Sequence, residues 1–121
     1  MGSKMQPYNK GDEKRGSLRR PIKEVALINK GIFEKDIFFS IALNISASGI
    51  LIETDKIMAL GDKIKCTFML QHRIDVAGEV IRVVRKAQDI YHYGVRFFNI
   101  DHGAKAEIEE LARGNRWMKG T

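Results

Sequence analysis

Large apolar side chains occupy every second position in one segment of this chain. The five residues are Ile37, Phe39, Ile41, Leu43 and Ile45. Because successive side chains of an extended strand point to opposite faces, this period of two predicts a β-strand over about 36–45 with all five side chains on the core face. Asn44 and Ser46 are then expected to share the opposite face and to project from the domain.

Other segments of the same kind occur along the chain. They are rich in β-branched and aromatic residues and are separated by turn-forming residues, which is the pattern of short strands. Strands are predicted at about 22–28, 36–45, 50–53, 63–70, 73–85 and 90–98. Turns are predicted at 29–31 and 60–62, and Gly78 is predicted to mark a bulge or bend in the long fifth strand.

A helix is expected after the last strand. Asp101 can cap its start and Gly114 can end it. Its buried side is predicted from the helical spacing of Ala104, Ile108 and Leu111. Six strands followed by one helix predict a mainly-β domain, a closed or nearly closed barrel with a C-terminal helix from about residue 101. The 121 residues, 44% of them hydrophobic, suffice for one such domain, expected over 21–121.

The first 20 residues differ in composition from the rest. They are polar and contain too little apolar surface to offset the entropy of ordering, so a flexible arm is expected. Six basic residues against two acidic ones give this arm a charge of +4, out of +6 for the whole chain. Such an arm suits an anion that carries phosphates, whether a nucleic acid, a membrane surface or a small nucleotide. Residues 1–4 are compatible with an expression-tag scar, because Met5 can serve as a start.

Several classes of function are disfavoured. No segment approaches the roughly 18 consecutive apolar residues of a membrane helix, and the N-terminus has no apolar signal region, so a cytoplasmic protein without membrane insertion is expected. The single cysteine, Cys66, alternates with apolar residues and is expected to be buried, and the three histidines show no metal-ligand spacing. No nucleophile, base and orienting group occur in a recognisable arrangement, so no enzyme, metal site or cofactor is expected.

Two short motifs indicate which kind of anion the domain binds. The first is Arg15-Gly-Ser-Leu-Arg19, followed directly by Arg20-Pro21, and the second is Asn44-Ile-Ser46-Ala-Ser-Gly49. They precede the first predicted strand and end the second one. Together they resemble the RxxxR and (D/N)xSxxG signatures of the PilZ domain family. The segments Gly78-Glu-Val-Ile-Arg-Val-Val and Tyr93-Gly-Val-Arg-Phe97 resemble its fifth-strand and last-strand patterns, so the resemblance covers nearly the whole chain from Arg15 onward.

The resemblance implies a six-stranded antiparallel PilZ-like barrel that binds cyclic di-GMP on its outer surface without making or breaking a bond in it. The implied ligand-binding residues are Arg15, Arg19, Arg20, Asn44, Ser46 and Gly49. The chemistry agrees, because guanidinium groups suit both phosphate oxygens and the O6/N7 edge of guanine. Asn44 and Ser46 can hydrogen-bond a guanine edge or a phosphate, and Gly49 is expected to allow a close approach of the ligand or a positive φ.

Our hypothesis for the mechanism is a switch from a flexible to an ordered arm. Ligand binding is expected to draw the arm over the barrel and so to change contacts with a downstream protein partner. Two alternatives stay open: a PilZ-like scaffold without ligand binding that docks a protein, and a small basic barrel that binds single-stranded nucleic acid. The second is disfavoured because Phe39, Phe68 and Phe97 are assigned to the core and not to a stacking surface. Arg82 and Arg96 are weighed as rim contacts but are not included in the predicted site.

Overall fold

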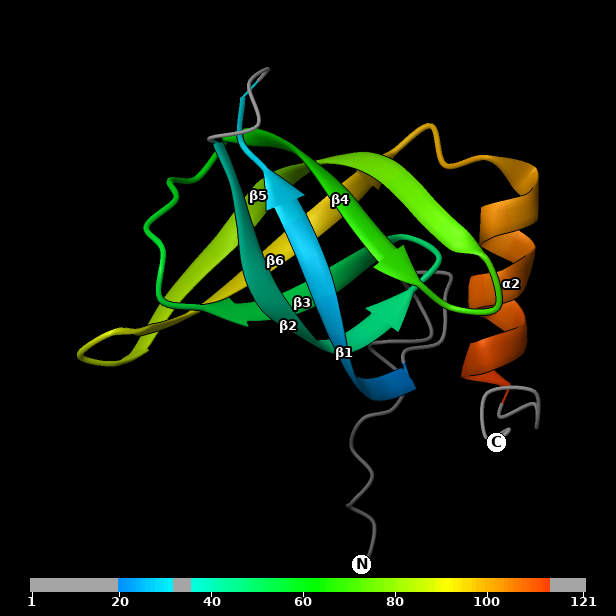
Figure 1. Cartoon of the computed structure of the whole chain (residues 1–121), viewed down its shortest axis with the longest axis horizontal. Helices are drawn as coiled ribbons and strands as arrows, with labels where there is room; N and C mark the ends of the chain where they lie inside the picture. The colour runs from blue at the N-terminus through cyan, green and yellow to red at the C-terminus, as the bar shows by residue number, and fades with distance from the viewer. Residues whose placement is uncertain (1–19, 32–35, 114–121) are drawn as a thin grey trace, which may run out of the picture.

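The computed structural model of the chain describes residues 20–31 and 36–113. Its elements are β1 (Arg20–Asn29), β2 (Ile37–Ser46), β3 (Gly49–Thr54), β4 (Lys63–Met69), β5 (Arg73–Ala87), β6 (Ile90–Phe98) and α2 (His102–Ala112). The strands close into an antiparallel barrel in the order β1-β2-β3-β6-β5-β4, and α2 lies beside one end of it (Figure 1). The predicted strands and fold class are confirmed, while the predicted arm lies outside the described residues.

The helix begins and packs as its sequence indicates. Asp101 is the N-cap, and its side chain accepts hydrogen bonds from the backbone N–H groups of Gly103 (3.3 Å) and Ala104 (3.1 Å). Its buried residues are Ala104, Ile108 and Leu111. These side chains join the core of the barrel, so the helix closes that end. Gly114, predicted to end the helix, lies outside the described residues.

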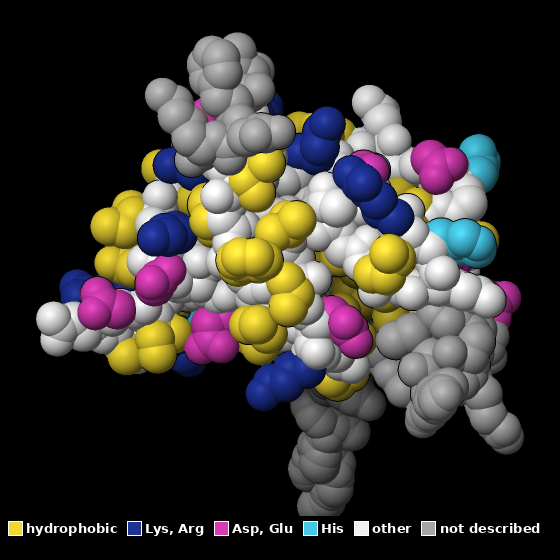
Figure 2. Space-filling model, viewed as in Figure 1, with side chains coloured by type: hydrophobic (Ala, Val, Ile, Leu, Met, Phe, Trp, Pro, Cys, Tyr) yellow, Lys and Arg dark blue, Asp and Glu magenta, His cyan; other side chains and the backbone are white. Residues whose placement is uncertain are grey.

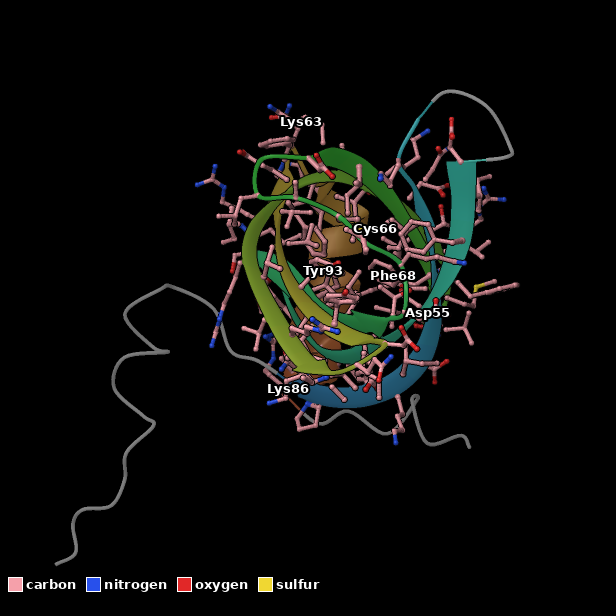
Figure 3. The ribbon with its side chains drawn as sticks, turned by 90° about the vertical axis from the view of Figure 1, so that its left-hand side faces the viewer. Asp55, Lys63, Cys66, Phe68, Lys86 and Tyr93 are labelled. Carbon is pink, nitrogen blue, oxygen red and sulfur yellow. The ribbon has the colours of Figure 1, made fainter. Side chains whose placement is uncertain are left out.

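The barrel interior is filled by apolar side chains from all of its strands. Figure 3 looks into the barrel from the end opposite α2, with Cys66, Phe68 and Tyr93 inside. Phe68 stacks on Phe97, with ring centroids 6.4 Å apart. Burial raises the pKa of the Cys66 thiol to about 12, which suits a packing residue and not a reactive thiol. The predicted burial of Cys66 is confirmed.

The predicted core face of β2 is wrong for the first half of the strand. Ile37, Phe39 and Ile41 face outward, with 39%, 71% and 36% of their surface exposed. Ser40 and Ala42, the small residues between them, face the core and are buried. A period of two therefore identified the strand correctly but assigned its faces the wrong way round here.

The pairing of β2 with its neighbouring strands explains this reversal. Ser40 lies opposite Ala26 of β1, and its hydroxyl donates to the Ala26 carbonyl oxygen (2.8 Å), so the buried polar group is satisfied. Leu43 has no partner on β3, because the register shifts between Ala42 and Asn44. This bulge reverses the alternation, and Ile45 returns to the core as predicted.

The two glycine-containing turns form where the sequence predicts them, but the bulge predicted at Gly78 does not. The Gly31 N–H donates to Asn29 Oδ1 (2.9 Å), and Gly61 has a φ of 90° in the turn before β4. Gly78 is paired on both sides, so the bulge predicted there is wrong. The register of β5 against β6 shifts between Val80 and Arg82 instead.

Tyr93 ties the barrel interior to the loop between β3 and β4. Its ring is fully buried, and its hydroxyl donates to the Lys56 carbonyl oxygen (2.8 Å) and accepts from the Met58 N–H (2.8 Å).

Tyr93→Phe leaves the Lys56 carbonyl oxygen and the Met58 N–H without this hydrogen-bond partner. We therefore expect the free energy of unfolding in urea to fall by about 1–2 kcal/mol. Tyr91→Phe is the matched control and is expected to change it by less than about 0.5 kcal/mol. Equal losses in the two variants would contradict this role.

Candidate functional site

A hollow of about 630 Å³ opens where the β2–β3 turn meets β5 and β6. It is lined by Asn44, Ser48, Gly49, Ile50, Leu51, Ile81, Arg82, Gly94, Val95 and Arg96. This volume lies within the roughly 300–1,000 Å³ that is usual for small-molecule sites. Among the predicted site residues, the hollow brings together Asn44 and Gly49.

Ser46 holds the turn between β2 and β3 instead of projecting from the barrel as predicted. It is 1% exposed, and its hydroxyl accepts a hydrogen bond from the Ser48 N–H (3.2 Å). The hydroxyls of Ser46 and Ser48 are 3.0 Å apart. Ser46 thus shapes the turn that presents Ser48 to the hollow, as serine hydroxyls commonly do at turns. A direct contact of Ser46 with a ligand stays a prediction.

Gly49 is required by the packing of two strands. A Cβ at this position would lie 2.2 Å from the Val95 carbonyl oxygen of β6. Next to it, the Phe97 N–H donates to the Ser48 carbonyl oxygen (2.9 Å). The φ of Gly49 is not positive, so that part of the sequence interpretation is wrong. Its position in the lining of the hollow is compatible with a close approach of a ligand, which stays a prediction.

Two arginines outside the predicted site residues line the hollow. Arg82 follows the bulge in β5, and the absence of a side chain on Gly94 leaves it room, since a Cβ there would lie 3.2 Å from Arg82 Cβ. Arg96 of β6 is exposed, and its Nη2 lies 3.2 Å from Oε1 of Glu79. Strand alternation could not place Arg82, because the bulge beside it changes which residue faces the hollow. The hollow is therefore basic along its β5–β6 side.

The chain enters the barrel beside this hollow. Arg20 begins β1 with its backbone opposite Ile45, and Pro21 lies opposite Asn44. Arg15 and Arg19 lie outside the described residues, so the structure does not place their side chains. The first motif nevertheless directly precedes a residue that is paired with the second motif.

Among the described residues, no group of three or more His, Cys, Asp and Glu side chains could hold a metal ion. None of the described helices is long and apolar enough to cross a membrane.

A closed six-stranded barrel with a helix at one end and a hollow beside the β2–β3 hairpin defines a small β-barrel domain. The model of the PilZ domain family matches residues 7–114. This chain belongs to the PilZ domain family. No curated protein sequence matches it closely enough to be counted as a relative.

Solved structures with a similar fold come from several bacteria. The inhibitor of motility MotI/DgrA of Bacillus subtilis has a TM-score of 0.70 and 17% identity, over 83% of this chain and 49% of that one. The MrkH–c-di-GMP complex of K. pneumonia has a TM-score of 0.62 and 15% identity, over 78% and 49%. The PilZ domain with c-di-GMP of YcgR from Escherichia coli has a TM-score of 0.59 and 12% identity, over 87% and 95%. At these identities the likeness shows the fold, and this chain spans about half the length of the MotI/DgrA and MrkH chains.

Proposed function

We propose that this chain is a receptor for cyclic di-GMP that acts as a signalling adaptor and catalyses no reaction. The observation that carries the proposal is the hollow, in which Asn44 and Gly49 of the second motif meet Arg82 and Arg96. Membership of the PilZ domain family supports it, as do two structural neighbours solved with c-di-GMP. The cytoplasmic location predicted from the sequence is part of the proposal.

The lining of the hollow suits the two kinds of group that cyclic di-GMP presents. Its phosphodiesters are anions that match the planar donors of Arg82 and Arg96, which can also stack on guanine rings. A guanine N1–H and N2–H₂ edge can donate to the side-chain oxygen of Asn44. The hydroxyl of Ser48 is a further group that lines the hollow and can donate or accept.

In this proposal Arg15, Arg19 and Arg20 close the site from the arm. Arg19 is covalently joined to Arg20, whose backbone lies opposite Ile45 and next to the Pro21–Asn44 pair. Arg15 lies five positions before Arg20, a reach of at most about 18 Å. Both motif arginines can therefore meet a ligand that is held beside Asn44. Bridging by the ligand changes the conformation of residues 1–20, and that change alters the contacts with a downstream protein.

The nucleic-acid alternative has less support than the receptor. One argument against it from the sequence is that Phe39 lies in the core. That assignment is wrong, because Phe39 is 71% exposed. Phe68 and Phe97 are buried as predicted. Among the described aromatic residues Phe39 is the one that is strongly exposed, and a single ring does not form a track on which successive bases can stack.

Isothermal titration with cyclic di-GMP tests the proposal. The wild type is expected to bind saturably with an excess of GTP present. Arg82→Ala is expected to weaken binding by about 1–1.5 kcal/mol, roughly tenfold, because it removes a charged donor from the lining. Absence of binding by the folded wild type would reject the receptor and favour the alternative of a scaffold that docks a protein. Binding that is unchanged in Arg82→Ala would place the ligand outside the hollow.

A further inference from the structure

An apolar surface lies on the outside of the barrel, away from the hollow. We use the term apolar face for Val25, Leu27, Ile37, Phe39, Ile41 and Met69, which belong to β1, β2 and β4. Phe39, Met69 and Val25 are 71%, 58% and 51% exposed. Figure 2 shows apolar side chains gathered over β1 and β2 at the centre of the view.

The strand register makes these side chains contiguous. Leu27 of β1 lies opposite Phe39 of β2 on one side and opposite Thr67 of β4 on the other. Val25 lies opposite Ile41, so two neighbouring rows of the sheet carry apolar side chains outward. Isolated exposed apolar residues are ordinary on a protein surface, but a contiguous patch marks an interaction site.

The two sides of the apolar face carry opposite charge. Beyond β1, on β4 and β5, lie Lys65 and Arg73, which we call the basic margin; Asp75 is there too and is paired with Arg73 (3.1 Å). Beyond β2 lie the acidic residues that we call the acidic margin. These are Glu53, Asp55 and Asp89, of which Glu53 lies 3.5 Å from His92. Phe39 lines the surface depressions on both sides and so stands between the margins.

We propose that two copies of this chain form a dimer with twofold symmetry through the apolar face. A twofold axis that lies in the plane of contact and runs along the strands places the basic margin of one copy against the acidic margin of the other, twice in each dimer. The two apolar faces then pack sheet against sheet, at the usual separation of about 10 Å. A second copy of the chain therefore complements both the apolar face and its two charged margins.

The dimer is expected to be reversible. A stable interface usually buries about 800 Å² on each partner, and the margins that flank the apolar face add to the area that the dimer buries. Association should therefore depend on protein concentration and weaken with added salt, which screens the charged pairs. The hollow shares no lining residue with the apolar face, so the dimer leaves it open and does not depend on the proposed ligand.

Sedimentation velocity over a series of concentrations tests the apolar face. The wild type is expected to pass from monomer to dimer, and Phe39→Asp is expected to raise the dissociation constant at least about thirtyfold with an unchanged melting temperature. Leu60→Asp is the matched control, because Leu60 is 65% exposed and lies outside the face. It should dimerise like the wild type. A wild type that stays monomeric, even one that binds another protein through this face, overturns the proposal, as does a Phe39→Asp variant that dimerises normally.

A charge exchange tests the twofold arrangement. Lys65→Glu alone and the double variant Asp55→Lys with Asp89→Lys alone are each expected to be monomeric, because both pairs of margins then repel. Mixed together, these two chains are expected to form a heterodimer, since each altered margin now meets its opposite. A mixture that stays monomeric while the wild type dimerises would reject the twofold pairing of the margins.

Discussion

Arg19→Ala is expected to weaken the binding of cyclic di-GMP by about 2–3 kcal/mol, roughly 30- to 150-fold. In the proposed site its guanidinium forms charge-assisted hydrogen bonds with a phosphate or with the O6/N7 edge of guanine. Arg19 directly precedes Arg20, whose backbone is paired with Ile45 of the second motif, so Arg19 is joined to a residue that lies beside the hollow. Titration calorimetry at one fixed salt concentration measures the effect.

Two further variants separate charge from geometry. Arg113→Ala removes the same charge from the exposed end of α2 and is expected to leave the affinity unchanged. Arg19→Lys keeps the charge but loses the planar fork, so an intermediate affinity is expected. If Arg113→Ala weakens binding as much as Arg19→Ala, the ligand responds only to net charge, and the specific role of Arg19 is wrong.

Gly49→Ala is expected to lower the free energy of unfolding by about 2–4 kcal/mol. The added Cβ would lie 2.2 Å from the Val95 carbonyl oxygen, which is backbone and is held in the pairing of β3 with β6. The clash therefore requires the two strands to separate. Urea unfolding followed by circular dichroism measures the loss, and any loss of ligand binding must be judged on the fraction that remains folded.

Gly103→Ala is the matched control for Gly49→Ala. Gly103 lies in α2, and an added Cβ would meet only the Asp101 side chain at 3.8–3.9 Å, which is ordinary contact. Alanine there favours the helix, so we expect a gain of about 0.5–1 kcal/mol. An unfolding free energy for Gly49→Ala within about 0.5 kcal/mol of the wild type would contradict the close packing of β3 on β6.

The fold was predictable from local patterns because most of its signals act over a few residues. The strands, the turn at Gly61 and the cap at Asp101 each depend on neighbours in sequence, and all appear in the structure. The outward orientation of the Phe39 side chain was not predictable from such local patterns. It depends on the pairing of Ser40 with Ala26 and on the bulge at Leu43, which are contacts between strands.

The site was predictable in part for the same reason. Asn44 and Gly49 belong to one short motif and come together in the hollow. Ser46 belongs to it too, but the turn takes its hydroxyl inward to Ser48. Arg82 could not be assigned without knowing the position of the bulge in β5, and Arg96 could not be assigned without the pairing of β6 with β3.

The most direct test of the central claim is to follow backbone amide shifts by ¹H–¹⁵N NMR while cyclic di-GMP is added. The account predicts that the largest changes fall on Asn44, Ser48, Gly49, Arg82 and Arg96 and on residues 15–20, with little change at Phe39 or Met69. Absence of any shift, or shifts confined to β1 and β4, would contradict the assignment of the hollow as the ligand site.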